Sequence, residues 1–364
     1  AASIYAGKKD YLVSAAPHDY SVSGNKVDLT STKKLMDDFL IKTGEQANEE
    51  VAVSYLFFGI KNQETNKLTV FTKNERKVVP KSIVLVFSQE TFKQLTGKEL
   101  NLSSNQIALY TKNKTFKTQK SLSIDGKNYQ IHRQLGDFIN KKVPNIYKII
   151  VSDYSYLVVP DIKIFESSMK GTSIAQATYV GVNVKDSTHD AKKNLDLLDQ
   201  IAGEATKQLA GQTTGVPESY FSANSRYDAE GMVNGFVGGT FFISIFLSII
   251  FMLGTVLVIY YKQISEGYED RERFVILQKI GLDDLQVKQT IRKQVLTIFF
   301  LPLIFAFIHL AFAYHMISLI VRIIGVLNPD LMLVVTIIVC GVFFLAYILV
   351  FVLTSRSYRR IVSM

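Results

Sequence analysis

Hydrophobic residues are distributed unevenly along this chain of 364 residues. In residues 1–230 they occur in short runs broken by polar residues, whereas the last third holds three long apolar runs. Each long run exceeds the roughly 20 helical residues that cross a hydrocarbon layer of about 30 Å, and none alternates like a barrel strand. We therefore predict three transmembrane helices, at about 235–261, 294–321 and 331–355.

Residues 1–230 carry the patterns of strands. Segments rich in β-branched and aromatic residues predict strands at 51–58, 68–72, 82–88, 106–111 and 177–184. The pair Asp125-Gly126 favours a tight primed turn, so it predicts a hairpin between 121–124 and 127–131. In that register one face of the hairpin carries Leu122, Ile124, Tyr129 and Ile131.

Helical spacing of apolar residues appears twice in the same region. It predicts a helix over 31–42, capped by Ser31 or Thr32, and a second over 188–210 that packs on the sheet. The second helix would bury one stripe, which consists of Leu195, Leu198, Ala202, Ala205 and Leu209. The following stretch, 211–224, has neither pattern and is the expected linker to the membrane part. Together these patterns predict an α-helical membrane protein with a large mixed α/β domain at 1–230 and a transmembrane domain at 231–364.

Lys and Arg residues in the short connections predict the orientation, because cytoplasmic loops carry their excess. The connection 262–293 and the C-terminal tail are rich in them, whereas the link between the second and third spans has only Arg322. The tail and the 262–293 loop are therefore expected in the cytoplasm, and residues 1–230 outside the cell membrane. The chain opens within that outer domain without an export signal, so we expect either that a signal peptide was removed or that further spans precede it, and we favour the second.

Motifs of catalysis are missing from the sequence. It has no G-x-x-x-x-G-K-[ST] phosphate loop, no HExxH, no paired cysteine ligands and no G-x-S-x-G. The formal net charge of +9 is shared between the outer domain and the cytoplasmic edges, and no basic stripe typical of nucleic-acid binding occurs. We expect a non-catalytic membrane subunit without a cofactor or metal. His309 and His315 lie within a span, and we expect both to be neutral packing or hydrogen-bonding residues.

Small residues mark the start of the first span. Gly231, Gly235 and Gly239 recur every four residues, a spacing that lets another helix approach closely; alternatively they only loosen the start of the helix. Pro302 lacks a backbone donor, so it is expected to kink the second span or end its cytoplasmic piece.

The segment between the first two spans is dense in charge yet carries an apolar stripe, which is typical of a short helix that docks on a partner. Its residues Tyr260-Tyr-Lys-Gln-Ile-Ser-Glu-Gly-Tyr-Glu-Asp-Arg-Glu-Arg-Phe274, followed by Gln278-Lys-Ile-Gly281, Ile291-Arg-Lys-Gln-Val295 and Phe299-Phe-Leu-Pro-Leu303, resemble the Bce-type (bacitracin-efflux type) permeases. These belong to the FtsX-like and MacB-like ABC transporter permeases. In that family an outer domain of this size lies between the seventh and eighth of ten spans.

The resemblance implies that this segment couples the chain to a separate ATPase. It implies that this segment includes Glu266, Gly267, Tyr268, Arg271, Arg273, Phe274 and Gly281. It also implies resistance to cell-wall-directed peptide antibiotics, a partner histidine kinase, and an outer domain that meets the antibiotic or its lipid pyrophosphate target. Two alternatives stay open: a mechanical regulator of a cell-wall hydrolase, and a membrane-anchored binding domain without an ATPase.

A basic stretch with an interleaved aromatic residue precedes the hairpin. Its cations are Lys112, Lys114, Lys117 and Lys120. Clustered cations attract a multiply charged anion, so the stretch is a candidate surface for a lipid pyrophosphate. The alternative is that these lysines protect an exposed sheet edge from aggregation.

Overall fold

The computed structural model describes residues 7, 9, 12–64, 66–75, 80, 82–144, 153–185, 190–210, 217–279, 281, 284–323 and 329–362. The chain divides into two compact units. One consists of Lys9–Asn234 and is called the α/β domain below. The other, called the helical unit, contains Gly235–Met364. Three long apolar helices and a ten-stranded mixed sheet with helices confirm the predicted fold class.

The strands of the α/β domain form one sheet in the order β10-β1-β9-β2-β3-β6-β7-β5-β8-β4. Their bounds are β1 Tyr20–Asn25, β2 Ala47–Gln63, β3 Lys67–Val70, β4 Ser82–Ser88, β5 Gln106–Thr111, β6 Ser121–Ile124, β7 Lys127–Gln134, β8 Asp153–Val159, β9 Ile174–Val184 and β10 Tyr220–Ser225. The helices are α2 Leu29–Thr43, α3 Gln89–Thr96, α4 Lys114–Lys117, α6 Ile162–Ser168 and α7 Ala191–Ala210.

Strand β2 belongs both to a closed ring of strands and to an open sheet. Phe57 faces Ala175 of β9 across one edge of β2 and Leu85 of β4 across the other. Because β4 also pairs with β8, the seven strands β2-β3-β6-β7-β5-β8-β4 close into a ring, and β9, β1 and β10 extend from it as an open sheet. A closed ring leaves those seven strands with few unpaired backbone groups.

Every second side chain of the ring strands points into the ring and fills its core. Successive side chains of a strand point to opposite faces, and every second residue of β2 from Leu56 to Ile60 lies in one buried cluster. Its other members come from all the ring strands except β7, and from α4, α6 and the residue after α6: Leu68, Val70, Val84, Val86, Ile107, Leu109, Phe116, Leu122, Ile124, Leu157, Val159, Phe165 and Met169. The hairpin is as predicted: Asp125 and Gly126 both have positive φ, and Leu122 faces Tyr129.

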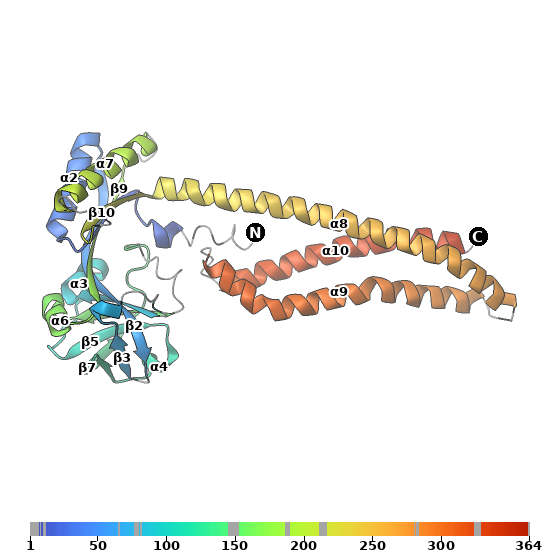
Figure 1. The fold of residues 1–364 in the computed structure, drawn as a ribbon, viewed down its shortest axis with the longest axis horizontal. Coiled ribbons are helices and arrows are strands. Elements are labelled where there is room, and N and C mark those ends of the chain that lie inside the picture. Colours follow the sequence, from blue (N-terminus) through green and yellow to red (C-terminus); the bar gives the residue numbers. More distant parts are fainter. Residues whose placement is uncertain are drawn as a thin grey trace. The chain divides into compact units, whose positions relative to one another are not determined.

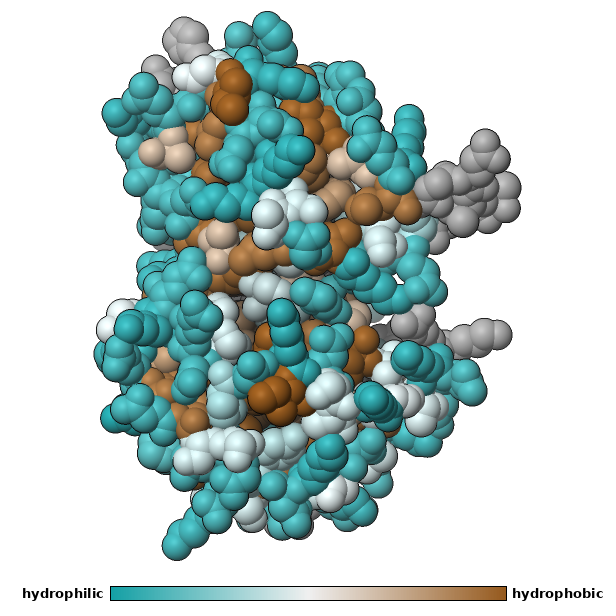
Figure 2. All heavy atoms as spheres, turned by 90° about the vertical axis from the view of Figure 1, so that its left-hand side faces the viewer, coloured by the Kyte–Doolittle hydropathy of each residue, from teal (hydrophilic) through white to brown (hydrophobic). Residues whose placement is uncertain are grey.

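A second core lies under two helices. In Figure 1, α2 and α7 lie side by side over the open sheet of β9, β1 and β10. Met36, Phe39 and Leu198 pack there against Tyr20 and Val180. The domain therefore has two lobes that share β2, and Figure 2 shows brown apolar surface where the lobes meet, between mostly teal polar faces.

Three details differ from the sequence-based expectations. Helix α2 begins earlier than predicted, because Asp28 caps it by accepting a hydrogen bond from the backbone N–H of Ser31 at 2.8 Å. Thr32 is buried instead, where its hydroxyl lies 2.7 Å from that of Thr178. On α7, Leu209 is 51% exposed, whereas Ala205 one turn earlier still packs on the core.

The predicted linker 211–224 is wrong at its C-terminal end, and residues 211–216 lie outside the described residues. Residues Tyr220–Ser225 form β10, paired antiparallel with β1 from Tyr20↔Ser225 to Asn25↔Tyr220. Most of these residues are small and polar, so the strand depends on its pairing with β1 rather than on local preference. The last residue of β10, Ser225, is therefore followed directly by the first residue of a long helix, Arg226.

The helical unit is built from α8 Arg226–Lys279, α9 Asp284–Ile323 and α10 Pro329–Val362, of which α8 begins in the α/β domain. Within the described residues, three segments are long and apolar enough to cross a membrane: Arg226–Glu269, Phe300–Val321 and Asp330–Val352. Helix α9 continues through Pro302, so this proline does not end it.

Candidate functional site

The turn between α8 and α9 lies in the segment predicted to couple to an ATPase. The stretch 262–293, expected as a loop, contains the last turns of α8 and the first turns of α9. Gly281 has φ 104°. This value favours glycine, because the Cβ of any other residue would clash with the backbone there. The two helices thus meet at Gly281, as the sequence predicts.

The proposed coupling residues other than Gly281 lie on the last turns of α8. Glu266 is half-buried, and its carboxylate lies 3.8 Å from Nζ of Lys262 one turn earlier. Tyr268 and Arg271 are exposed, and Gly267 is buried. At roughly 100° per residue, Tyr268 and Arg271 share one side of the helix and Glu266 lies on another. The side chains of Arg273 and Phe274 lie outside the described residues.

The glycines at the start of α8 have open space beside them. A Cβ built on Gly231, Gly235 or Gly239 would meet nothing within 4 Å in the described part of the chain. No helix among the described residues therefore packs closely on this ridge, and its role in helix contact stays a prediction.

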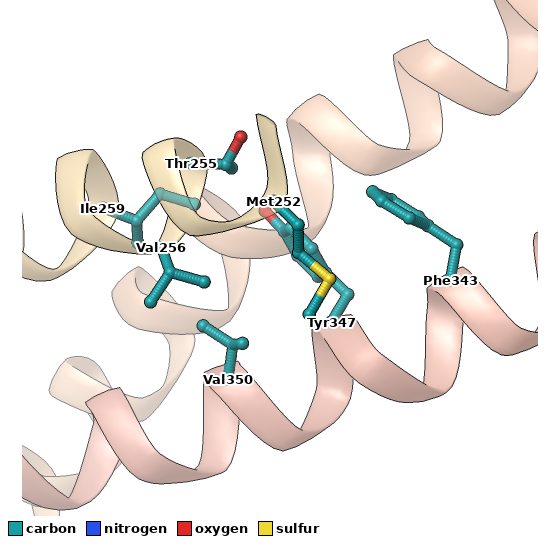
Figure 3. Close-up of a pocket in the computed structure, with 7 residues that line it drawn as sticks. All are labelled: Met252, Thr255, Val256, Ile259, Phe343, Tyr347 and Val350. Carbon is teal, nitrogen blue, oxygen red and sulfur yellow. The ribbon is translucent and has the colours of Figure 1, made fainter. Parts of the chain in front are cut away.

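Helices α8 and α10 face each other across a small cavity. Figure 3 shows Met252, Val256 and Ile259 of α8 opposite Tyr347 and Val350 of α10. The cavity has a volume of about 10 Å³, which is room for about one water molecule. Its lining is almost wholly apolar, so it is a packing gap of the helical unit rather than a ligand site.

The first residue of α8 is bound tightly to the α/β domain. The guanidinium of Arg226 donates to Oδ1 of Asp19 at 3.1 Å and to the carbonyl of Ala16 at 3.3 Å, and its backbone N–H donates to the carbonyl of Asp19 at 3.0 Å. Oδ2 of Asp19 accepts from the backbone N–H of Val184 at 3.0 Å. We call Arg226, Asp19 and Ala16 the joint, because they fasten α8 to the strand ends of β1 and β9.

A buried histidine lies beside the joint. His18 is almost fully buried, and its Nδ1 lies 2.7 Å from the hydroxyl of Tyr179. A Cβ on Gly181 would come within 2.5 Å of that hydroxyl, so glycine is what leaves room for the pair. The pKa of His18 is lowered to about 4, chiefly by burial and to a smaller extent by Arg226, while Glu49 and Asp19 oppose the shift.

Sequence reasoning missed both features. Arg226 stands 207 residues from Asp19, and no local pattern relates residues so far apart. The available signal was weaker: Arg226 is an isolated cation just before a long apolar run.

The residues of the basic stretch lie in different environments. Lys112 follows β5, and its Nζ lies 5.1 Å from the centre of the Tyr154 ring. Lys117 and Lys120 are exposed, and the side chain of Lys114 lies outside the described residues. Phe116, the aromatic residue of the stretch, is buried inside the ring of strands, so it is not available to a ligand. Among the described residues, no group of three His, Cys, Asp or Glu side chains is placed to hold a metal ion.

Comparison with known proteins gives partial matches. No protein-family model matches the chain. The ABC transporter permease protein YxdM of Bacillus subtilis (strain 168) is 35% identical over 72 residues, covering 20% of this chain and 12% of that protein. The Bacitracin export permease protein BceB of the same organism is 29% identical over 140 residues, covering 38% of this chain and 19% of that protein.

A third relative, the uncharacterized ABC transporter permease YvcS of Bacillus subtilis (strain 168), is 29% identical over 121 residues, covering 33% of this chain and 18% of that protein. Among solved structures, a putative lipoprotein from Bacillus anthracis aligns with a TM-score of 0.28 and 12% identity, covering 57% of this chain and 96% of that one; a likeness this weak carries no argument. The matches thus span 12% to 19% of the curated relatives' lengths. Over part of its length, this chain is similar to Bacillus ABC transporter permeases that include the Bce-type permease BceB.

Proposed function

We propose that this chain is part of the permease of a Bce-type ABC transporter, which senses and confers resistance to cell-wall-targeting peptide antibiotics. The observation that carries the proposal is the similarity to BceB over 140 residues, in a chain that joins a large α/β domain to three apolar helices. A separate ATPase, as a dimer, supplies the energy, and a sensor histidine kinase is the second partner. The α/β domain lies outside the cell membrane and the C-terminus lies in the cytoplasm.

Continuity of α8 supports a mechanical role for this helix. It contains 54 residues, which corresponds to about 80 Å at 1.5 Å per residue. One end is fastened by the joint to the strands of the α/β domain, and the other carries the proposed coupling residues. An ATPase that moves the cytoplasmic end of α8 would therefore act on the α/β domain through this helix.

The ATPase contact is tested by a double variant, Glu266→Lys with Phe274→Ala. We expect the full chain carrying it to insert normally into the membrane but to retain less than a tenth of the ATPase in a pull-down. A matched control, Glu204→Lys with Phe242→Ala, makes the same two changes on the exposed surfaces of α7 and α8 and should retain the ATPase fully. Unchanged retention by the first variant contradicts the docking assignment.

Antibiotic sensitivity tests the cellular role. A strain without this gene should become more sensitive to bacitracin or a related peptide. If the strain instead shows altered cell-wall hydrolysis with normal sensitivity, the protein is a regulator of a hydrolase rather than a resistance permease.

A further inference from the structure

A groove opens where β2 changes partners. On one edge, β2 pairs with β9 as far as Phe58↔Ile174 and with β3 from Ile60↔Val70 onward. The open sheet and the ring of strands diverge at this point, and the backbone N–H of Ser173 bridges them by donating to the carbonyl of Phe71 at 2.6 Å. The hollow between the two lobes has a volume of about 380 Å³, within the range of sites that hold small ligands.

The groove has aromatic and prolyl walls. Phe57, Phe71, Pro80, Pro217 and Tyr220 line it, from segments far apart in the sequence. All five rings are at least partly exposed, and Tyr220 is 39% exposed. A Cβ on Gly59 would lie 2.7 Å from the ring of Pro80, so glycine at this position allows the prolyl wall to sit against β2. Partly exposed rings facing one hollow are a favourable surface for apolar side chains.

The charged residues of the groove are already paired. Lys26 forms an ion pair with Glu218, and Nζ of Lys61 lies 2.5 Å from Glu75. Glu75 also accepts from the backbone N–H and the hydroxyl of Thr72, both at 3.1 Å. The hydrogen bond from Lys61, followed by those from Thr72, lowers the pKa of Glu75 to about 2. A multiply charged anion would find no cation without an anionic partner among these residues. The chemistry of the groove therefore favours an uncharged, ring-bearing or aliphatic ligand.

We propose that this groove binds apolar side chains of a peptide ligand, with Tyr220 and Phe57 as its principal contacts. The inference rests on the proposed function, in which the transporter acts on peptide antibiotics, and it separates peptide recognition here from any pyrophosphate recognition by the basic stretch. Tyr220 begins β10, and the residue after β10 is Arg226 of the joint. A peptide that presses on Tyr220 thus acts on a strand that leads directly to α8.

The chain has no tryptophan, so Phe71→Trp places a single indole reporter in the groove. The experiment uses the full chain in lipid nanodiscs and titrates it with two uncharged peptides of equal length, one carrying two phenylalanines and the other alanines instead. Bacitracin and inorganic pyrophosphate serve as further probes. We expect saturable changes in indole emission with the phenylalanine peptide and with bacitracin, and none with the alanine peptide or pyrophosphate.

Two groove variants and one control decide the outcome. Tyr220→Ala should weaken binding of the phenylalanine peptide about tenfold or more, because it removes an aromatic contact, and Ala175→Leu should do so by filling the groove from β9. Tyr227→Ala, which removes a 59% exposed ring on the first turn of α8, should bind as the parent does. Amide exchange in β4 and β8 checks that each variant is folded.

Equal affinity in the parent and both groove variants overturns the inference, as does the absence of any peptide signal in the parent. Displacement of the peptide by pyrophosphate also overturns it, because that would make the groove an anion site. The proposed function is judged separately, by the bacitracin sensitivity of the deletion strain and by retention of the ATPase. A groove that fails while those two hold moves the peptide site elsewhere and leaves the permease assignment standing.

Discussion

The α/β domain and the three long helices keep apolar side chains from water in opposite ways. In the domain, alternate residues of each ring strand point into a shared core, and Phe58, Val86 and Leu157 are at most 1% exposed. In the helical unit, apolar residues surround each helix, and the most apolar windows of α8 and α9 are 0% buried. The domain supplies its own apolar environment through folding, whereas the helices require lipid or other helices to cover them.

This difference determines where single substitutions act. A truncated side chain in the domain leaves a cavity that the closed ring cannot fill, whereas a truncated side chain on an uncovered helix surface leaves none. Helix α8 contains residues of both units, and the joint fastens its first residue within the α/β domain. Changes at the joint should therefore act on the α/β domain where α8 begins.

The largest effect is expected in the ring core. Phe58→Ala should lower the stability of the α/β domain by about 3–5 kcal/mol, because Phe58 is 1% exposed and stacks on Phe165 at 6.4 Å between ring centres. Amide exchange in β4 and β8 of the full chain measures the loss as a lower free energy of opening. The matched variant Phe242→Ala, at a 70% exposed position of α8, should leave that exchange unchanged. Similar losses in both variants would show that the two regions do not differ as argued.

The sequence predicts the helical unit well, because uniform apolarity over more than 20 residues has few alternative explanations. Within the domain, the predicted strands correspond to β2 to β7 and β9, and the bounds of β4 and β5 match those expected. Strands β1 and β8 are not predicted, although β8 is rich in aromatic and β-branched residues. Strand β10 is missed because its Ser222, Ala223 and Asn224 have little strand preference and acquire their conformation from β1. Closure of the ring is also missed, because it depends on β2 pairing with β4 as well as β9, and no local pattern indicates which strands pair.

Candidate sites also divide into those made of sequence neighbours, which the sequence predicts, and those made of distant segments, which it does not. The turn at Gly281 is predicted from local sequence, because glycine and flanking helical patterns are local signals. The joint and the groove join residues from three or more distant segments, so no spacing reveals them. In the basic stretch, the fold separates sequence neighbours: Phe116 lies in the core, whereas Lys117 and Lys120 are exposed.

The next largest effect is a pH dependence that originates beside the joint. His18 has a pKa of about 4 in the folded domain against 6.5 in an ordinary setting, chiefly because it is buried. Between these values the unfolded chain binds a proton that the folded domain does not, so stability falls as pH falls from 6.5 towards 4. The slope from this group is at most about 1.4 kcal/mol per pH unit. Urea unfolding between pH 7 and pH 4.5 measures it.

His18→Asn is the informative variant here, because an amide can replace Nδ1 as the partner of the Tyr179 hydroxyl without titrating. It should flatten the pH dependence over that window even if it lowers stability at pH 7. Tyr179→Phe removes the hydroxyl but keeps the histidine buried, so its pH dependence should persist. An unchanged slope in His18→Asn would assign the dependence to other groups.

A smaller effect is expected at the glycine ridge of α8. If another helix packs on Gly231, Gly235 and Gly239, then Gly235→Leu should reduce antibiotic protection several-fold at unchanged expression, because the backbones can no longer approach closely. Gly254→Leu, further along α8, also has nothing within 4 Å of its Cβ position and is the control. Full protection by Gly235→Leu would mean that the ridge faces lipid.

The smallest effect should come from the basic stretch, where exposed charges are screened by salt. If Lys112, Lys114 and Lys117 attract a lipid pyrophosphate, changing all three to Gln should weaken binding of a short-chain prenyl pyrophosphate to the full chain a few-fold at low salt. The difference should disappear as the screening length shortens from about 10 Å at 0.1 M salt to about 3 Å at 1 M. A control that changes Lys192, Lys193 and Lys207 of α7 to Gln removes the same charge from another exposed surface. Because Lys112 already lies over the ring of Tyr154, most of the loss should come from the other two lysines. Equal binding by the parent and both triple variants would leave the stretch as a surface that protects a sheet edge.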